Sequence, residues 1–492
     1  MSAMPSIFNK ALILSITIPV GLLNACALDK PPAASDLALH AMGASGEHRQ
    51  WANQAVQGDP ADGWLAGFGD DELNPLVREA MTHNGDLAIA AIRVQQAEAL
   101  VAVQDSALLP NAGARGRGGQ AESQIVSVGA SWELDLWGRI RAQARAANSQ
   151  RIASQADYVW AQRVVAATTA KAWFALIKCT QLENTLGQIV GIQAQLVDIE
   201  GRRVAIGAAP QSELEQARNT LRENQDALAK ATLARNRAAQ ALELLLGRYP
   251  AGEMQAGAAL PTLPAAPPAG LPARLIERRP DMIAAYERVA AAFDQRQAAQ
   301  AARLPTVSIS AAITGIRSNV LSLVDSRSPI AGVNASFLAP IFTGGKLKAQ
   351  ADYYSEEQKA VIVAYDNSAL EALSEVEAGL QAEASLSARA TQLQARVQEC
   401  QVLESQAATR ARIGSADERQ VLQDRQAMLT AQMDLVGVLS DQLAQRVDLL
   451  LALGGDWQRA AVASANTDDA TPAAFPIAAK GVDRDDMLRQ GR

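Results

Sequence analysis

The sequence contains few aromatic residues, histidines and cysteines for its length. Its 492 residues include Trp 7, Tyr 6, Phe 7, His 3 and Cys 3. Ordinary globular domains draw much of their core volume from aromatic side chains. Here the hydrophobic fraction of 49% comes mostly from Ala, Leu, Val and Ile. This composition argues against several compact cores and favours long packed helices.

Charge and motif content exclude several classes of function. The balance of 45 Lys and Arg against 52 Asp and Glu, a net charge of −7, lacks the basic footprint of a nucleic-acid-binding protein. His40, His48 and His83 have no metal-ligand spacing, so we expect no metal or other cofactor. The sequence has neither a G-x-S-x-G motif nor a Walker A loop. We therefore expect no catalytic residue and no enzymatic activity.

One long apolar run stands near the N-terminus, although the mean hydropathy of −0.03 is too polar for a helical membrane protein of several spans. Residues 11–23 are too few to cross a bilayer of about 30 Å and match the apolar part of a signal peptide. The run ends in Leu23-Asn24-Ala25-Cys26, which resembles the bacterial lipobox. It predicts a lipoprotein signal peptide over 1–25 and a palmitate-bearing lipid anchor on Cys26. By resemblance to lipoprotein sorting rules, Ala27 directs the chain to the outer membrane. The alternative is an ordinary secreted precursor with an incidental cysteine.

Two halves of the chain share one plan, because several motifs recur at a constant offset of 207 residues. The matching pairs are Arg203-Val-Ala-Ile-Gly207 with Arg410-Ala-Arg-Ile-Gly414, Trp137-Gly-Arg139 with Gly344-Gly-Lys346, and Leu244-Leu-Leu-Gly247 with Leu451-Ala-Leu-Gly454. The expected organisation is an N-terminal anchor and extended segment over 26–72, a first repeat over 73–247, a linker over 248–272, a second repeat over 273–457 and a disordered tail over 458–492.

Each repeat contains two segments with the period-2 alternation of a β-strand. They cover 126–136 and, more weakly, 112–120 in the first copy, and 307–314 and 333–337 in the second. Strands of roughly 10 residues match the length of a tilted transmembrane β-strand. A soluble hairpin with one buried face fits the same alternation equally well.

The segments around these strands predict unusually long helices. Residues 139–205 and 346–412 each form a rod of about 100 Å at 1.5 Å per residue. Shorter helices over 74–107 and 211–246 together match the first rod in length, so they can stack end to end along it. Gly207 and Gly414 suit tight turns at the ends of the rods. A coiled-coil scaffold is the alternative interpretation of these helices.

The predicted strands require a shared barrel if they lie in a membrane. Four strands cannot close a barrel, since single-chain barrels begin at about 8 strands, and open strand edges are costly in lipid. Three chains would supply twelve strands. The predicted fold class is therefore mainly α with membrane β: duplicated long helical hairpins forming a trimeric α-barrel, topped by a 12-stranded transmembrane β-barrel with four strands per protomer.

Four motifs resemble those of the TolC-like outer-membrane efflux family, in its lipoprotein (nodulation-type) branch. They are Gly63-Trp64 with Phe68-Gly69-Asp70, Trp132-Glu-Leu-Asp-Leu-Trp-Gly-Arg139, Arg279-Pro280-Asp281, and Pro340-Ile-Phe-Thr-Gly-Gly-Lys346. The resemblance implies a homotrimeric exit duct of a tripartite efflux pump that exports drugs or other toxic small molecules. It implies a periplasmic adaptor and an inner-membrane transporter, often of the resistance-nodulation-division class, as partners. A periplasmic coiled-coil scaffold or adaptor lipoprotein is the alternative of a different class.

The resemblance also assigns roles to residues at the helical turns. It places Arg203, Gly207, Arg410 and Gly414 at the periplasmic tip, where they serve adaptor docking or gating. The alternative for the two arginines is a favourable interaction with a helix C-terminus. Asp417 could supply one carboxylate of a three-fold selectivity ring, or only a favourable charge at a helix N-terminus.

Four aromatic residues flank the predicted strands and could form an aromatic belt at the membrane interface, with packing between subunits as the alternative. They are Trp132, Trp137, Phe337 and Phe342.

Cys179 and Cys400 occupy non-equivalent places in the two repeats. We expect two free thiols there, although one disulfide is arithmetically possible.

Overall fold

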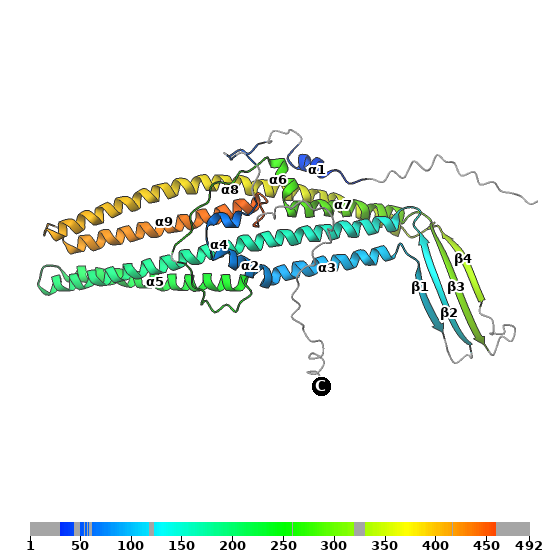
Figure 1. Cartoon of the computed structure of the whole chain (residues 1–492), viewed down its shortest axis with the longest axis horizontal. Helices are drawn as coiled ribbons and strands as arrows, with labels where there is room; N and C mark the ends of the chain where they lie inside the picture. Colours follow the sequence, from blue (N-terminus) through cyan, green and yellow to red (C-terminus); the bar gives the residue numbers. More distant parts are fainter. Residues whose placement is uncertain are drawn as a thin grey trace, which may run out of the picture.

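Two helices of 67 residues each form the frame of the molecule in the computed structural model (Figure 1). They are α4 (Arg139–Ala205) and α8 (Lys346–Arg412), and their predicted bounds are confirmed. The structure describes residues 30–43, 50–53, 55, 56, 58, 62–117, 123–257, 259–318, 330–415 and 417–458. Cys26, the predicted signal peptide and residues 459–492 of the predicted tail lie outside these ranges.

Shorter helices line both halves of each long helix. They are α2 (Leu73–His83), α3 (Gly85–Ser106) and α5 (Gln211–Leu245) in the first repeat, and α6 (Pro272–Arg278), α7 (Pro280–Ala301) and α9 (Glu418–Ala452) in the second. Helix α3 packs on the sheet-side half of α4 and α5 on its far half, while α7 and α9 pack on α8 in the same way. The predicted stacking along the rods is thus observed. Among the described helices, none is long and apolar enough to cross a membrane.

The predicted single helix over 74–107 is wrong, because the chain breaks between α2 and α3 at Asn84. The side-chain oxygen of Asn84 accepts hydrogen bonds from the backbone N–H groups of Asp86 (3.0 Å) and Leu87 (3.1 Å), which caps α3. Its side-chain nitrogen donates to the carbonyl of Leu245 (3.2 Å) at the end of α5. The cap therefore also connects the break to the last residue of α5, 161 residues later in the chain.

A glycine at the end of the returning helix packs against the break in each repeat. Gly247 and Gly454 have φ values of +69° and +68°. A Cβ atom on Gly247 would stand 2.6 Å from the carbonyl oxygen of His83, and one on Gly454 would stand 3.2 Å from Cγ of Arg279. Because only glycine combines positive φ with so close an approach, these positions join the helix ends at mid-length of the rod.

A four-stranded antiparallel sheet caps one end of the helices, and the predicted two strands per repeat are confirmed. Its strands are β1 (Asn111–Arg117), β2 (Ser123–Leu134), β3 (Thr306–Ser318) and β4 (Ile330–Leu338), in the order β1-β2-β3-β4. Pairing of β2 with β3 joins the two repeats. The register places apolar side chains on one face, for example Val128 opposite Ile313, and polar ones on the other, for example Ser131 opposite Ser310.

Four aromatic residues gather where the helices meet at mid-length. Trp64 and Phe68 lie on the short 3-10 helix η2 (Trp64–Phe68) and are buried beside Trp173 and Phe174 of α4. The indole nitrogen of Trp173 donates to the Asp70 carboxylate (2.8 Å). Around them the core is built from small and aliphatic side chains of α2, α4, α5 and α9. The cysteines Cys179 and Cys400 are free.

The paired glycines provide a test of the joint between the helices. We expect Gly247→Ala to lower the midpoint of thermal unfolding more than Gly207→Ala. Both positions have positive φ, which costs about 1 kcal/mol in alanine, but no atom lies within 4 Å of a Cβ at Gly207. Overpacking against His83 adds about 1–3 kcal/mol at Gly247. Circular dichroism of the purified variants in detergent measures the difference, and equal midpoints would contradict the role of the joint.

Candidate functional site

The two helical turns at the end far from the sheet form a matched pair of tips (Figure 1). Gly207 and Gly414 both have a φ of +73°. The backbone N–H of the next residue donates to the carbonyl of Arg203 in one turn and of Arg410 in the other, at 2.8 Å in each. This is the C-terminal capping arrangement that a left-handed glycine permits. Both turns thus have the glycine geometry that the sequence predicts.

The two tip arginines differ in their surroundings. Arg203 is partly buried and donates through Nη1 to the carboxylates of Glu200 (2.7 Å) and Glu213 (3.0 Å). Arg410 is exposed and forms no ion pair with any residue that the structure describes. At the repeat-equivalent position of Glu200 the second copy has a buried alanine, Ala407. Both repeats therefore have the same turn, but only Arg203 is paired with carboxylates of the described residues.

Glu200 connects the two helical hairpins of the chain at this tip. Its side chain is only 10% exposed, and its Oε1 atom accepts a hydrogen bond from Nη1 of Arg419 on α9 at 2.9 Å. Arg419 also donates through Nε to the Asp417 carboxylate at 2.8 Å. Sequence reasoning missed Glu200, Glu213 and Arg419. The three-residue spacing of Glu200 and Arg203 on one helix face was the available signal, but nothing in the sequence pointed to Arg419.

These contacts hold the acidic groups in their charged form. Burial raises the pKa of Glu200, but hydrogen bonds from Arg419 and Arg203 outweigh burial and set that pKa below its ordinary value of 4.5. The backbone N–H and guanidinium of Arg419 lower the pKa of Asp417. The same carboxylates raise the pKa of Arg419. The tip is therefore a set of mutually stabilised charges at neutral pH.

Asp417 is the N-cap residue of α9 and immediately precedes its first residue, Glu418. Its Oδ1 atom accepts from the backbone N–H of Arg419 (3.0 Å), and its Oδ2 atom accepts from the Arg419 guanidinium (2.8 Å). Within one chain, the contacts of Asp417 are thus those of a charged residue at a helix N-terminus, which is the second of the two roles considered for it. The three-fold ring remains a prediction, and each carboxylate in such a ring would carry a paired arginine.

Above the tip, polar pairs continue between α4 and α9 at heptad spacing. Lys171 pairs with Asp448 (2.6 Å) and Lys178 with Asp441 (3.6 Å). Nearer the tip, the Gln193 amide donates to Gln426. Apolar residues on both sides of this last pair along α4 and α9 form one cluster: Ile189, Ile192, Leu196, Leu422 and Leu429. The pairs therefore fix the register of α4 against α9 down to Glu200.

The four predicted interface aromatics lie at the junction of sheet and helices. Trp132 donates from its indole nitrogen to the carbonyl of Leu108 (2.9 Å), and Trp137 donates to that of Pro305 (2.6 Å). Phe337, near the end of β4, and Phe342, just after it, are 69% and 89% exposed. The junction thus presents large apolar surface beside the start of the long helices.

Carboxylates at the same junction begin α4. The Asp135 carboxylate accepts from the backbone N–H groups of Ile140 (3.0 Å) and Arg141 (2.9 Å). Glu133 forms an ion pair with Arg139 at 2.8 Å. Sequence reasoning did not identify these caps, although acidic residues just before a helix are a known signal.

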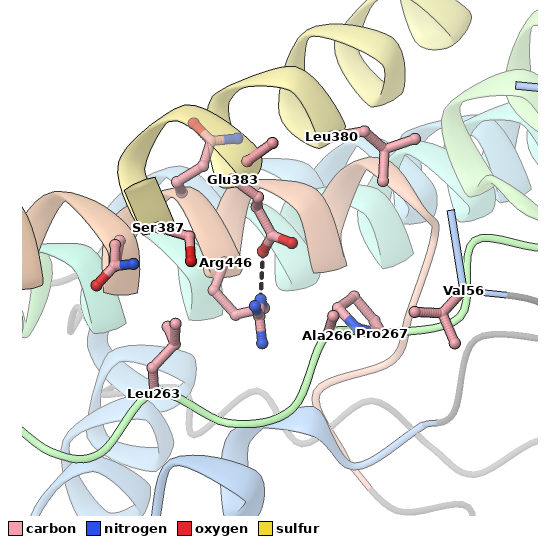
Figure 2. Close-up of a pocket in the computed structure, with 11 residues that line it drawn as sticks. Val56, Leu263, Ala266, Pro267, Leu380, Glu383, Ser387 and Arg446 are labelled. Carbon is pink, nitrogen blue, oxygen red and sulfur yellow. Dashed lines mark hydrogen bonds and ion pairs between the residues drawn. The ribbon is translucent and has the colours of Figure 1, made fainter. Parts of the chain in front are cut away.

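A separate pocket lies where the linker crosses α8 and α9 (Figure 2). Its volume is about 280 Å³, and Leu263, Ala266 and Pro267 of the linker line one side. A buried ion pair of Arg446 with Glu383 lies beside it, and Arg446 also donates to the carbonyl of Pro264. No residue predicted for function lines this pocket, and its polar contacts connect the linker to the helical hairpin of α8 and α9.

The described residues also contain no cluster of three or more His, Cys, Asp or Glu that could hold a metal ion.

Comparisons with known proteins match this architecture. The sequence pattern of the family described as "Outer membrane efflux protein" matches residues 76–248 and 271–455, which is more than half of the chain. The cation efflux system protein CusC of Escherichia coli is 26% identical over 411 residues, covering 81% of this chain and 89% of the relative. The pyoverdine export outer membrane protein OpmQ of Pseudomonas putida is 28% identical over 432 residues, covering 82% and 90%.

A solved structure has the same fold. The Campylobacter jejuni CmeC outer membrane channel aligns with a TM-score of 0.75 at 24% sequence identity, covering 83% of this chain and 91% of the other. The predicted fold class, long duplicated helices with a small β-sheet in the manner of these channels, is confirmed.

Removing the charge of Glu200 tests its role at the tip. We expect Glu200→Gln to speed amide hydrogen exchange at the tip ends of α4 and α9 by roughly tenfold or more, since a hydrogen bond to a charged group contributes about 1.5–3 kcal/mol. In the wild type the folded pKa lies below the unfolded value, so the contribution is present at neutral pH and is lost as pH falls below about 4.5. Exchange rates corrected for the intrinsic pH dependence should therefore converge with those of the variant in acid.

Glu213→Gln is the matched control for this experiment. Glu213 pairs with Arg203 within the first hairpin and forms no ion pair with a described residue of α9, so exchange at the start of α9 should stay at the wild-type rate. If both variants behaved alike, Glu200 would not connect the hairpins.

Proposed function

The chain belongs to the outer membrane efflux protein family and is an outer-membrane efflux channel, and we propose that three copies form the exit duct of a tripartite pump. The observation that carries the proposal is the segregation of the four-stranded sheet into an apolar and a polar face. An apolar outer face and a polar inner face are required of a barrel in lipid. Members of this family are channel proteins rather than enzymes.

The trimer follows from the edges of the sheet. In one chain β1 and β4 each pair on one side only, and unpaired backbone groups are costly in a bilayer. Pairing β4 of one copy with β1 of the next around a three-fold axis satisfies both edges and makes twelve strands. A monomeric scaffold lipoprotein, the alternative, offers no explanation for a sheet with an exposed apolar face.

The helical part supports the assignment of partners. At 1.5 Å per residue a 67-residue helix reaches about 100 Å from the sheet, far beyond a membrane. We therefore assign a periplasmic adaptor to the tip and an inner-membrane transporter, of the resistance-nodulation-division class, beyond it. The named relatives export different cargoes, cations and pyoverdine among them. Our proposal for the cargo is accordingly broad: toxic small molecules such as drugs.

The tip residues divide into two roles in this proposal. Arg203 and Asp417 belong to the ion-pair network that holds the hairpins together, so they act in gating. Arg410 is exposed beside its turn and is the residue that we assign to the adaptor. Gly207 and Gly414 supply the turn geometry for both.

The membrane end carries two further proposals. Trp132, Trp137, Phe337 and Phe342 mark the inner interface, where aromatic side chains are enriched. Cys26 carries the lipid that anchors the N-terminus in the same leaflet. The docked helix α1 (Ala34–Ala41) supports this, because its first residue is only eight positions after Cys26 and it packs against α8.

Sizing in detergent followed by single-channel recording tests the duct. We expect a trimer whose dissociation requires heat, and discrete conductance steps in planar bilayers, because only a closed barrel spans the bilayer with all strands paired. A monodisperse monomer without conductance would overturn the proposal and favour the scaffold.

The same recordings include a control for the gate. Glu200→Gln should keep the unit conductance and increase the fraction of time spent open, while Glu213→Gln should change it less. Equal open fractions in wild type and both variants would remove the tip network from gating while leaving the duct intact.

Metabolic labelling tests the anchor. Palmitate should label the wild-type chain and fail to label Cys26→Ala, since the thiol is the predicted attachment point. Cys179→Ala, which replaces a thiol on α4, should retain the label. Persistent labelling of Cys26→Ala would place the lipid elsewhere.

A further inference from the structure

Arg115 lies on the polar face of the sheet, and the register places Arg117, two positions further along β1, on the same face. Strand pairing puts it opposite Ser127, which in turn lies opposite Thr314. The other described side chains of this face are small or uncharged, apart from Glu133. They are Asn111, Ser127, Ser131, Thr306, Ser308, Ser310, Ala312, Thr314, Ile330, Asn334, Ser336 and Leu338.

Glu133 does not balance Arg115. Glu133 lies six residues beyond Ser127 along β2, which is about 20 Å at 3.3 Å per residue. Its carboxylate is already paired with Arg139 at 2.8 Å. Among the described side chains of the polar face, Arg115 is therefore the charge without an opposite partner, and Arg117 on the same face has the same sign.

The opposite face has a different character along its described length. Up to the row of Val126 and Gly315 it carries no charged residue, and Arg317 follows in the next row; its apolar residues are Val126, Val128, Trp132, Ile309, Ile313, Val333 and Phe337. Lipid requires the apolar face and water the polar one. In the proposed trimer, on which this inference rests, Arg115 thus points into the lumen.

We propose that the three copies of Arg115 form a cationic ring in the outer part of the barrel, which makes the duct favour anions, including organic compounds that carry carboxylate or phosphate groups. Three-fold symmetry puts the guanidinium groups at one level. Guanidinium groups bind carboxylates and phosphates through paired hydrogen bonds. The Thr314 hydroxyl in the same row adds a neutral donor, while the Ser127 hydroxyl donates to the Arg115 carbonyl at 3.5 Å.

The size of the barrel makes such a ring effective. Twelve strands about 4.8 Å apart and tilted by about 40° form a cylinder with a backbone radius of about 12 Å. Because the arginine side chains extend inward from that wall, an ion on the axis passes within about one Debye length, roughly 8 Å at physiological ionic strength, of every guanidinium. The three charges therefore act together on each permeating ion.

Reversal potentials of the reconstituted trimer in a KCl gradient test the ring. We expect Arg115→Ser to lower the permeability ratio of chloride to potassium by at least about twofold, and Arg115→Glu to lower it further. Arg115→Lys retains the charge and should retain the wild-type ratio. The difference between wild type and Arg115→Ser should shrink at about 1 M KCl, where the Debye length is only about 3 Å.

Ala114→Ser is the matched control, because it puts the same hydroxyl on the adjacent position of the apolar face. It should leave the permeability ratio unchanged. If channels of normal conductance form and Arg115→Ser leaves the ratio unchanged, the ring is wrong and the duct stands. If no trimer or channel forms in the wild type, both the duct and the ring are wrong.

Discussion

The unpaired edges of β1 and β4 are the constraint on which the rest of the structure depends. A sheet of four strands with one apolar face cannot end in lipid with free backbone N–H and C=O groups. Closing the sheet into a barrel requires strands from other copies of the chain. When these copies are arranged around one axis, the polar face of each sheet points toward that axis. In the proposed trimer the same axis would bring the alanine-rich faces of the long helices of neighbouring copies into lateral contact. The barrel would therefore determine the helical tube below it.

Duplication explains the frame, and divergence within it explains the tip. Both repeats keep the 67-residue helix, the glycine turn and the glycine that packs on the helix break. Near the tip they differ at a buried position, because Glu200 of the first repeat aligns with Ala407 of the second. That single carboxylate gathers Arg203 and Arg419 and so connects the hairpins of one chain. Arg410 lacks such a partner among the described residues and stays exposed.

The long helices, the strands and the glycine turns could be predicted from the sequence. Each of them depends on the spacing of apolar residues or glycines that lie close to one another in the chain. The predicted bounds of 139–205 and 346–412 needed only periodicity and the turns that follow. The break at Asn84 was missed because its second contact is Leu245, and no local signal reveals a partner so distant. Glu200 and Arg419 were missed for the same reason, since their contact depends on the register of α4 against α9. Asp417 was recognised as a charge near a turn, but its pairing with Arg419 required the fold.

The distribution of charge separates two kinds of control along the molecule. At the tip, acidic and basic groups neutralise one another across the hairpins, so their contribution lies in which helices they hold together. In the sheet, Arg115 has no partner that neutralises it on the described polar face, so its contribution lies in the field that it creates. A paired charge stabilises a conformation, whereas an unpaired one in a narrow aqueous lumen acts on whatever passes. In the duct that we propose, opening and selection would therefore depend on different residues, about the length of a 67-residue helix apart.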